Sequence, residues 1–256
     1  MHYWQSIILG IVEGFTEFLP ISSTAHLILS GRIFNITQTE FVKSFEIIIQ
    51  LGAILAIVWL YGKKTILNLN IIKKVTAAFV PTAIFGFLLY KVFKNYLMEN
   101  FTIIVWSLLL GGIFIIVFEY WHREKADATD SIENISYKHC FLIGLCQAVA
   151  MIPGVSRSAA TILGGMFLGM KRKTIVEFSF LLAVPTMLAA TGYDLLKTGL
   201  TFSKDQFGLL LVGFLTSFFV AIIAVKFLLH YIQRRDFKWF GVYRIVIALI
   251  FLLIIL

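Results

Sequence analysis

Charged residues are scarce in this chain: they make up 14% of its 256 residues, against about 25% in typical soluble proteins. Hydrophobic residues make up 59%, so a soluble fold would lack the polar surface that it needs to stay in solution. Cysteine is also nearly absent. Cys140 and Cys146 are six positions apart, a spacing that fits neither a metal-ligand motif nor a disulfide framework. We therefore expect a membrane protein in which both thiols fill space in the core.

The apolar residues fall in long runs. A helix needs about 20 apolar residues to span the bilayer core. Runs of roughly this length, each an expected transmembrane helix, lie at 44–61, 75–93, 101–119, 174–196, 207–229 and 240–256. No cleavable signal peptide is expected, because the N-terminus has no cationic stretch and Glu13 and Glu17 interrupt its apolar residues.

Two further apolar segments, 3–33 and 138–169, are broken in the middle. In each, an apolar stretch runs into a proline, Pro20 or Pro153, and then into a cluster of hydroxyl residues. Proline ends the first helix, and a serine or threonine can cap the second. Each half is too short to cross alone, so both segments are predicted to be re-entrant hairpins. Irregular backbone at that depth must be buried in protein or line a wet cavity.

The two broken segments resemble each other. Residues at matching places are 134 positions apart: Gly10 and Gly144, Glu13 and Gln147, and Ser22 and Ser156. Each segment is followed by three expected spans. We therefore expect an all-α polytopic membrane protein, one membrane domain over 1–256, made of two repeats at about 1–120 and about 138–256. A cytoplasmic loop at about 121–137 would join them.

The number of crossings and the loop charges predict the orientation. A hairpin adds no crossing and three spans add an odd number, so the second repeat is inverted and the site lies near the midplane between the repeats. Fourteen lysines and arginines fall on one face and six on the other, which makes the first face cytoplasmic. Both termini are then external. The net charge of +8 suits anionic lipid headgroups, and no nucleic-acid partner is expected.

Glu13 and Glu17 lie one helical turn apart, on one helix face. Two like charges at membrane depth are costly, so something must offset them. The candidates are a divalent cation, a shared proton, or Arg157 from the second hairpin. The alternative is a pair of glutamates at the lipid edge, at the mouth of the hairpin.

Ser22, Ser23 and Thr24 open the second half of the first hairpin, and His26 follows one turn after Ser23. Helix capping beside a packed histidine is the simplest interpretation. The same spacing would also permit base activation of a hydroxyl or direct attack by the imidazole.

Arg157 lies at the tip of the otherwise apolar second hairpin, where an arginine costs about 2.5–3.5 kcal/mol. It follows Pro153-Gly154 and is flanked by Ser156 and Ser158 at an expected helix N-terminus. Helix-end N–H groups and a guanidinium together make an anion site suited to phosphate. A snorkelling arginine does not fit this depth. Because both hairpins aim a helix N-terminus at the centre, the site suits a diphosphate.

Three more polar residues are candidates for supporting contacts around this site or for simple interhelical hydrogen bonds: Glu46, Gln50 and Gln147.

EGFTEFLPISSTAHL at 13–27 and PGVSRSAAT at 153–161 resemble the two signature motifs of the undecaprenyl-diphosphate phosphatase family, also called the bacitracin-resistance family. The resemblance implies hydrolysis of undecaprenyl diphosphate to undecaprenyl phosphate and inorganic phosphate. The site would open to the external face of the bacterial inner membrane. The reaction recycles the lipid carrier for cell-wall synthesis and confers bacitracin resistance. The resemblance also implies that the activity depends on a divalent cation, Mg²⁺ or Ca²⁺.

Carried onto this chain, the resemblance makes Glu13 and Glu17 metal ligands, or Glu17 a base, and makes Arg157 the phosphate clamp. Ser23 is the favoured nucleophile, with His26 and water as alternatives. The phosphates are expected to contact Ser22, Thr24, Gly154, Ser156, Arg157, Ser158 and Thr161.

Two other classes of function remain open. Inverted repeats with broken helices are also a transport architecture, so a transporter or flippase for a phosphorylated lipid or anion is the main alternative. A non-catalytic membrane scaffold would leave the buried charges unexplained. The expected partners are the lipid substrate and the bilayer, and a homodimer is compatible with the sequence.

Overall fold

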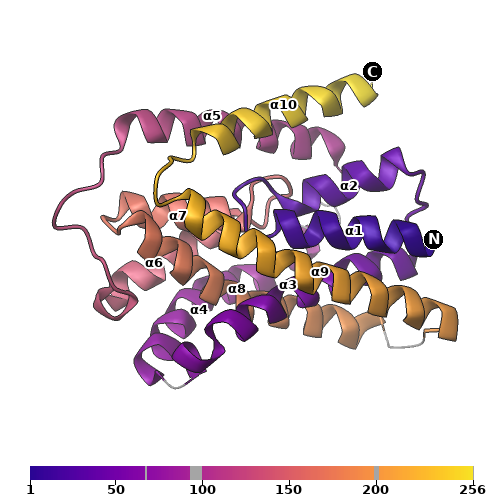
Figure 1. Ribbon diagram of the computed structural model, residues 1–256, viewed down its shortest axis with the longest axis horizontal. Helices are drawn as coiled ribbons and strands as arrows, with labels where there is room; N and C mark the ends of the chain where they lie inside the picture. The colour runs from indigo at the N-terminus through magenta and orange to yellow at the C-terminus, as the bar shows by residue number, and fades with distance from the viewer. Residues whose placement is uncertain (67, 93–99, 199–201, 256) are drawn as a thin grey trace.

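The computed structural model describes residues 1–66, 68–92, 100–198 and 202–255 (Figure 1). Within these ranges every regular element longer than a single β-bridge is helical. The helices are α1 (Tyr3–Thr16), α2 (Ser23–Ile33), α3 (Glu40–Ile66), α4 (Leu69–Val92), α5 (Phe101–Trp121), the 3₁₀ turn η2 (Ile132–Asn134), α6 (Tyr137–Val149), α7 (Arg157–Phe167), α8 (Arg172–Thr198), α9 (Lys204–Tyr231) and α10 (Lys238–Ile255).

Five helices are long and apolar enough to cross a membrane: α3, α4, α5, α8 and α9. Their outward surfaces are apolar, with Trp59 and Phe87 each 76% exposed, as expected for side chains that face lipid. These helices confirm a multi-pass helical membrane protein. The sixth expected span forms α10, which is 18 residues long and is not among the five.

The two broken segments form two pairs of short helices, α1 with α2 and α6 with α7. The chain breaks at 17–22 and at 150–156, as the prolines predict. Ser22 and Ser156, which end the breaks, adopt nearly the same unusual backbone conformation, with φ of 73° and 77°. Positive φ at a non-glycine residue costs about 1–3 kcal/mol and persists only where the surroundings enforce it. The two breaks are therefore built alike.

The short helices pack closely on long helices from the other half of the chain. Helix α1 lies on α9, and α6 lies on α4. Glycine makes both approaches possible. A Cβ on Gly10 would lie 2.7 Å from the carbonyl oxygen of Gly213, and a Cβ on Gly144 would collide with the carbonyl of Ala78. Each short-helix pair is thus held by a helix from the opposite half.

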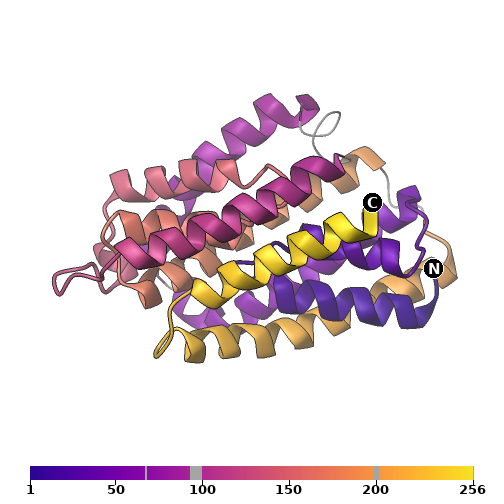
Figure 2. The ribbon, with the colours of Figure 1, turned by 90° about the horizontal axis from the view of Figure 1, so that it is seen from above.

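Helices α5 and α10 run side by side along one flank of the bundle (Figures 1 and 2). They touch at Gly112 and Gly241, where a Cβ on either residue would lie 2.7 Å from the other's carbonyl oxygen. The two chain termini lie at the same end of the molecule, opposite the loop between α5 and α6 (Figures 1 and 2).

That loop is fastened to the bundle. The buried Lys74 donates hydrogen bonds to the carbonyl oxygens of Ile132, Glu133 and Ile135. Arg172 pairs with Glu119 at 2.7 Å, which joins the end of α5 to the start of α8.

Candidate active site

The two breaks meet inside the bundle, and a buried ion pair joins them. Nη2 of Arg157 lies 2.9 Å from Oε1 of Glu17, and the two side chains are 8% and 3% exposed. Nearby, the Ser158 hydroxyl donates to the carbonyl oxygen of Leu19 at 2.8 Å. Residues about 140 positions apart in the sequence therefore form one site, and Arg157 offsets the charge of Glu17, which is one of the three possibilities that the sequence left open.

Glu17 also receives a hydrogen bond from the favoured nucleophile. The Ser23 hydroxyl donates to Oε2 of Glu17 at 2.5 Å, and both residues are buried. A short hydrogen bond to a charged acceptor is a strong one. Glu17 thus bridges Ser23 and Arg157, one carboxylate oxygen to each.

Several contacts fix the Arg157 side chain. Its Nη1 donates to the carbonyl oxygen of Ser179 at 3.0 Å, and its guanidinium lies 5.6 Å from the ring centre of Phe18. The Thr161 hydroxyl bonds the Ser179 hydroxyl at 2.6 Å and donates to the Arg157 carbonyl oxygen at 3.0 Å. Thr161 therefore supports Arg157, and its expected contact with phosphate stays a prediction.

His26 is turned towards α10. Its Nδ1 lies 2.7 Å from the carbonyl oxygen of Ser22, and its Nε2 lies 2.8 Å from the Tyr243 hydroxyl. A carbonyl only accepts, so Nδ1 carries the hydrogen, and Nε2 of a neutral ring accepts from Tyr243. In the described part of the chain Ser23 bonds Glu17 rather than His26. Tyr243 was not foreseen from the sequence, where it looks like any aromatic in an apolar helix.

Glu13 is fully buried, and its carboxyl group interacts with that of Glu17. Within the described ranges no hydrogen-bond donor contacts its carboxylate oxygens. It lies one turn before Glu17, whose N–H bonds the Glu13 carbonyl oxygen at 3.0 Å. No group of three or more His, Cys, Asp or Glu side chains that could hold a metal occurs among the described residues. Any cation here would depend on these two carboxylates and on oxygens of other kinds.

Arg244 is the largest fully buried side chain of the described residues, and sequence reasoning missed it. All five of its hydrogen bonds go to backbone carbonyls: those of Pro20, Ser107, Leu108, Gly154 and Val155. Pro20 belongs to the first break, and Gly154 and Val155 belong to the second. One guanidinium on α10 thus holds both breaks together. The available signal was a lone arginine inside the apolar run at 240–256. An arginine is costly in an apolar segment, and the same reasoning pointed to Arg157.

The remaining expected phosphate contacts are unequally placed. Ser156 caps α7 by accepting from the Ala159 N–H at 3.3 Å, and its hydroxyl lies 3.1 Å from that of Ser158. Ser22 precedes α2 without a side-chain capping bond, so the expectation of hydroxyl capping is wrong for this residue, whose positive φ sets the start of α2 instead. Thr24 is exposed. Gly154, with a φ of 92°, lies against α5.

The three supporting candidates do not contact the ion pair through any recorded hydrogen bond in the described residues. Gln147 donates to Thr82 at 2.8 Å and to Thr186 at 3.0 Å. These are interhelical hydrogen bonds, the expected alternative to a supporting contact in the site. Glu46 accepts from Gln38 at 3.2 Å. Gln50 is partly buried on α3.

The fold and the site define a polytopic helical membrane protein with a buried carboxylate–hydroxyl–arginine centre, an arrangement suited to binding an anion. Residues 6–250 match the family model of bacitracin resistance protein BacA. The chain belongs to this family.

Curated relatives match over almost the whole chain. A protein of Aquifex aeolicus (strain VF5) called undecaprenyl-diphosphatase is 51% identical over 251 residues, which cover 98% of each chain. Proteins with the same name from Sulfurihydrogenibium sp. (strain YO3AOP1) and Persephonella marina (strain DSM 14350 / EX-H1) are 49% and 48% identical, covering 97% and 98% of this chain and 98% of each relative.

Proposed function

We propose that this protein hydrolyses undecaprenyl diphosphate to undecaprenyl phosphate and inorganic phosphate. This activity would recycle the lipid carrier for cell-wall synthesis and confer bacitracin resistance. The name shared by the relatives gives the substrate. The observation that carries the proposal is the Glu17 carboxylate, which accepts from Ser23 at 2.5 Å and pairs with Arg157 at 2.9 Å. The nucleophile hydroxyl of Ser23, the base carboxylate of Glu17 and the phosphate-binding guanidinium of Arg157 are thereby in contact.

Ser23 is the favoured nucleophile. Its Oγ attacks the terminal phosphorus while its proton passes to Oε2 of Glu17. The bond from this phosphorus to the bridging oxygen breaks, and undecaprenyl phosphate leaves with the electron pair and receives the proton from Glu17. Water then attacks the phosphoserine and gives a proton to Glu17. The Ser23 oxygen leaves and recovers that proton, and inorganic phosphate is released.

Arg157 binds the non-bridging phosphate oxygens in this scheme. Its Nη2 bonds Glu17, and its buried Nε–H has no partner in the described part of the chain. The N-terminus of α7 begins at Arg157 itself, and helix-end N–H groups favour phosphate. Ser22, Gly154 and Ser156 lie in the two breaks, and Thr24 and Ser158 lie in the first turns of α2 and α7. All five are proposed as further contacts.

His26 is the second candidate nucleophile, and water activated by Glu17 is the third. The contacts of His26 argue for a positioning role, because Nε2 already accepts from Tyr243 and Nδ1 is held by Ser22. His26 would have to leave Tyr243 before its ring nitrogen could attack phosphorus.

A divalent cation, Mg²⁺ or Ca²⁺, is the proposed cofactor, and the residues present fit it. Glu13 offers two buried oxygens that no hydrogen-bond donor contacts among the described residues, and Glu17 lies one turn away. Mg²⁺ is commonly bound by one or two carboxylates plus substrate phosphates, so Glu13 together with the substrate phosphates can suffice. When bound, the cation would neutralise charge on the diphosphate. Glu13 would hold it, which leaves Glu17 free to act as the base.

The proposed architecture is a pair of inverted repeats, at about 1–120 and about 138–256, each opening with a re-entrant hairpin. Three observations support it. The helices follow in the same order with similar lengths, such as 11 and 11 residues for α2 and α7, and 27 and 27 for α3 and α8. Ser22 and Ser156 share their φ. Helix α1 lies on α9, and its counterpart α6 lies on α4, which is the counterpart of α9. A two-fold axis between the repeats would relate these two contacts.

We place the site open to the external face of the bacterial inner membrane, with both termini external. The end that carries the loop at about 121–137 and the turn between α9 and α10 would be cytoplasmic, because basic residues gather in the cytoplasmic loops of membrane proteins.

Phosphate release by the purified protein in detergent tests the proposed function. Detergent micelles have no second compartment, so release from undecaprenyl diphosphate shows hydrolysis, whereas a transporter or flippase would release nothing. Ser23→Ala should lose nearly all activity and Ser23→Cys should lose less, and EDTA should abolish activity reversibly. Full activity of Ser23→Ala would pass the nucleophile role to His26 or water, and absence of release by the wild type would reject the phosphatase.

A further inference from the structure

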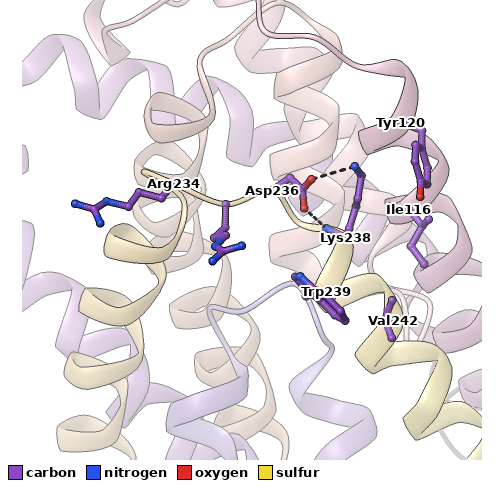
Figure 3. A pocket seen from close by; sticks show the side chains of 8 residues that line it. Ile116, Tyr120, Arg234, Asp236, Lys238, Trp239 and Val242 are labelled. Carbon is purple, nitrogen blue, oxygen red and sulfur yellow. Dashed lines mark hydrogen bonds and ion pairs between the residues drawn. The ribbon is translucent and has the colours of Figure 1, made fainter.

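A second polar pocket lies at the end of the molecule opposite the termini, away from the two breaks. It has a volume of about 420 Å³ and opens between the last turns of α5, the turn after α9 and the start of α10 (Figure 3). Its lining residues are Ile116, Tyr120, Arg234, Arg235, Asp236, Lys238, Trp239 and Val242. The proposed hydrolysis uses none of them.

The pocket carries an excess of positive charge. Its lining includes three basic residues, Arg234, Arg235 and Lys238, and one acidic residue, Asp236, which pairs with Lys238 at 3.2 Å (Figure 3). Arg234 and Arg235 are exposed, and neither guanidinium forms an ion pair or hydrogen bond within the described residues. Two arginine forks are therefore free to bind an anion, and an arginine fork matches the oxygens of a phosphate group.

The lining of the pocket is amphipathic: it combines charged, aromatic and aliphatic side chains. Tyr120 and Trp239 are 69% and 66% exposed at its rim, and aromatic residues of this kind gather at membrane–water interfaces. Lys238 is fixed above the Tyr120 ring at 4.4 Å. Ile116 and Val242 extend the lining along the flank where α5 and α10 run side by side (Figure 2). A charged group at the mouth and an apolar chain along this flank would both be accommodated.

Buried contacts beside the pocket hold the start of α10 against α5. Glu119, in the last turn of α5, binds Arg172 at 2.7 Å and accepts from the Phe237 N–H at 3.0 Å. These contacts join α5, α8 and the turn before α10. The backbone N–H groups of Arg234 and Arg235 both donate to the carbonyl oxygen of Tyr231, at 3.2 and 3.0 Å, so the turn that carries the arginines is hydrogen-bonded to the end of α9.

We propose that this pocket binds the headgroup of an anionic phospholipid, with Arg234 and Arg235 on the phosphate and the acyl chains along α5 and α10. Juxtamembrane basic pockets with aromatic neighbours suit anionic lipids. A soluble anion would use the arginines alone and leave the apolar flank without a role.

Native mass spectrometry of the delipidated protein, titrated with phosphatidylglycerol or phosphatidylcholine, tests the proposal. Two arginines near a lipid surface contribute about 1 kcal/mol each, so Arg234→Gln/Arg235→Gln should raise the apparent Kd for phosphatidylglycerol by at least about tenfold. The matched control is Lys125→Gln/Lys138→Gln, which removes the same charge from exposed residues at the same end, and its Kd should stay within about twofold of wild type. Phosphate release in detergent should match wild type in both variants.

Asp236→Asn gives a test whose expected result, tighter binding, would not arise from misfolding. Removing the only carboxylate of the pocket should tighten the binding of phosphatidylglycerol, while thermal unfolding confirms that all variants are folded. Equal binding of phosphatidylcholine, an equal loss in the lysine control, or displacement of the lipid by an equal concentration of inorganic phosphate would each overturn the lipid assignment.

Discussion

Glu17 is the residue on which the site depends, because its carboxylate bonds Ser23 and Arg157 at once. Removing one partner of a buried ion pair leaves the other charge uncompensated and typically costs about 3–5 kcal/mol. Truncating Glu17 or Arg157 would therefore mix loss of function with loss of stability. Substitutions that keep the charge or the shape separate the two effects.

Arg157→Lys keeps the charge but loses the planar fork that binds two phosphate oxygens at once. We expect a folded protein with less than about a tenth of wild-type turnover, because tenfold corresponds to about 1.4 kcal/mol of lost transition-state binding. Phosphate release measures the activity, and thermal unfolding in detergent checks the fold. Turnover near the wild-type value would remove Arg157 from the clamp role.

The two glutamates should respond differently to neutralisation. Glu13→Gln should raise the Mg²⁺ or Ca²⁺ concentration needed for half-maximal activity, because Glu13 has two buried oxygens that no hydrogen-bond donor contacts in the described chain. Glu17→Gln should lower turnover at every cation concentration, since an amide cannot take the proton of Ser23. Cation titrations of both variants distinguish the roles. Identical titration curves for Glu13→Gln and wild type would contradict the cation site.

Tyr243→Phe tests what His26 does. The change keeps the stacked rings, 5.5 Å apart, and removes one hydrogen bond worth about 1 kcal/mol. If His26 is a positioning residue, turnover should fall about fivefold and the KM should change little. If His26 Nε2 is the nucleophile, freeing it from Tyr243 should leave turnover unchanged or raise it.

At the scale of elements, the local pattern of the sequence predicted most of what the structure shows. Prolines followed by hydroxyl residues marked both breaks, and apolar runs marked the long helices, because these signals lie in neighbouring residues. The contacts of α10 could not be predicted in this way. Tyr243 reaches His26, and Arg244 reaches Pro20, over more than 200 positions of sequence, and no local pattern specifies such a pairing.

The approach of α1 to α9 can be tested with a single methyl group. A Cβ on Gly10 would lie 2.7 Å from the Gly213 carbonyl oxygen and 2.9 Å from Cβ of Thr216. Overpacking of this kind costs about 1–3 kcal/mol, so Gly10→Ala should lower the Tm. The matched control is Gly192→Ala in α8, which has nothing within 4 Å of its added Cβ and should gain up to about 1 kcal/mol of helix propensity.

The same measurement applies to Gly144→Ala, the counterpart of Gly10 in the second half. Its Cβ would collide with the carbonyl of Ala78 on α4, so its Tm should fall at least as far. A neutral Gly10→Ala together with a destabilising Gly144→Ala would show that the two packing contacts are not equivalent.

At the scale of the whole molecule, the proposed orientation determines which leaflet the substrate would reach. Both termini lie at one end, together with the end of α2, and the loop between α5 and α6 lies at the other (Figures 1 and 2). The positive-inside rule predicts that this loop is cytoplasmic. The diphosphate would then enter the site from the outer leaflet without crossing the membrane.

Single cysteines test this assignment in a Cys140→Ser/Cys146→Ser background. Asn35, after α2, and Ala126, in the loop after α5, are both exposed. The segment after α2 and the loop after α5 lie at opposite ends of the molecule (Figure 1). An impermeant thiol reagent applied to intact cells stripped of any outer membrane should label Asn35→Cys readily. It should label Ala126→Cys only after lysis, and the cysteine-free background gives the blank. Labelling of Ala126→Cys alone in intact cells would reverse the proposed topology and place both termini and the end of α2 on the cytoplasmic side.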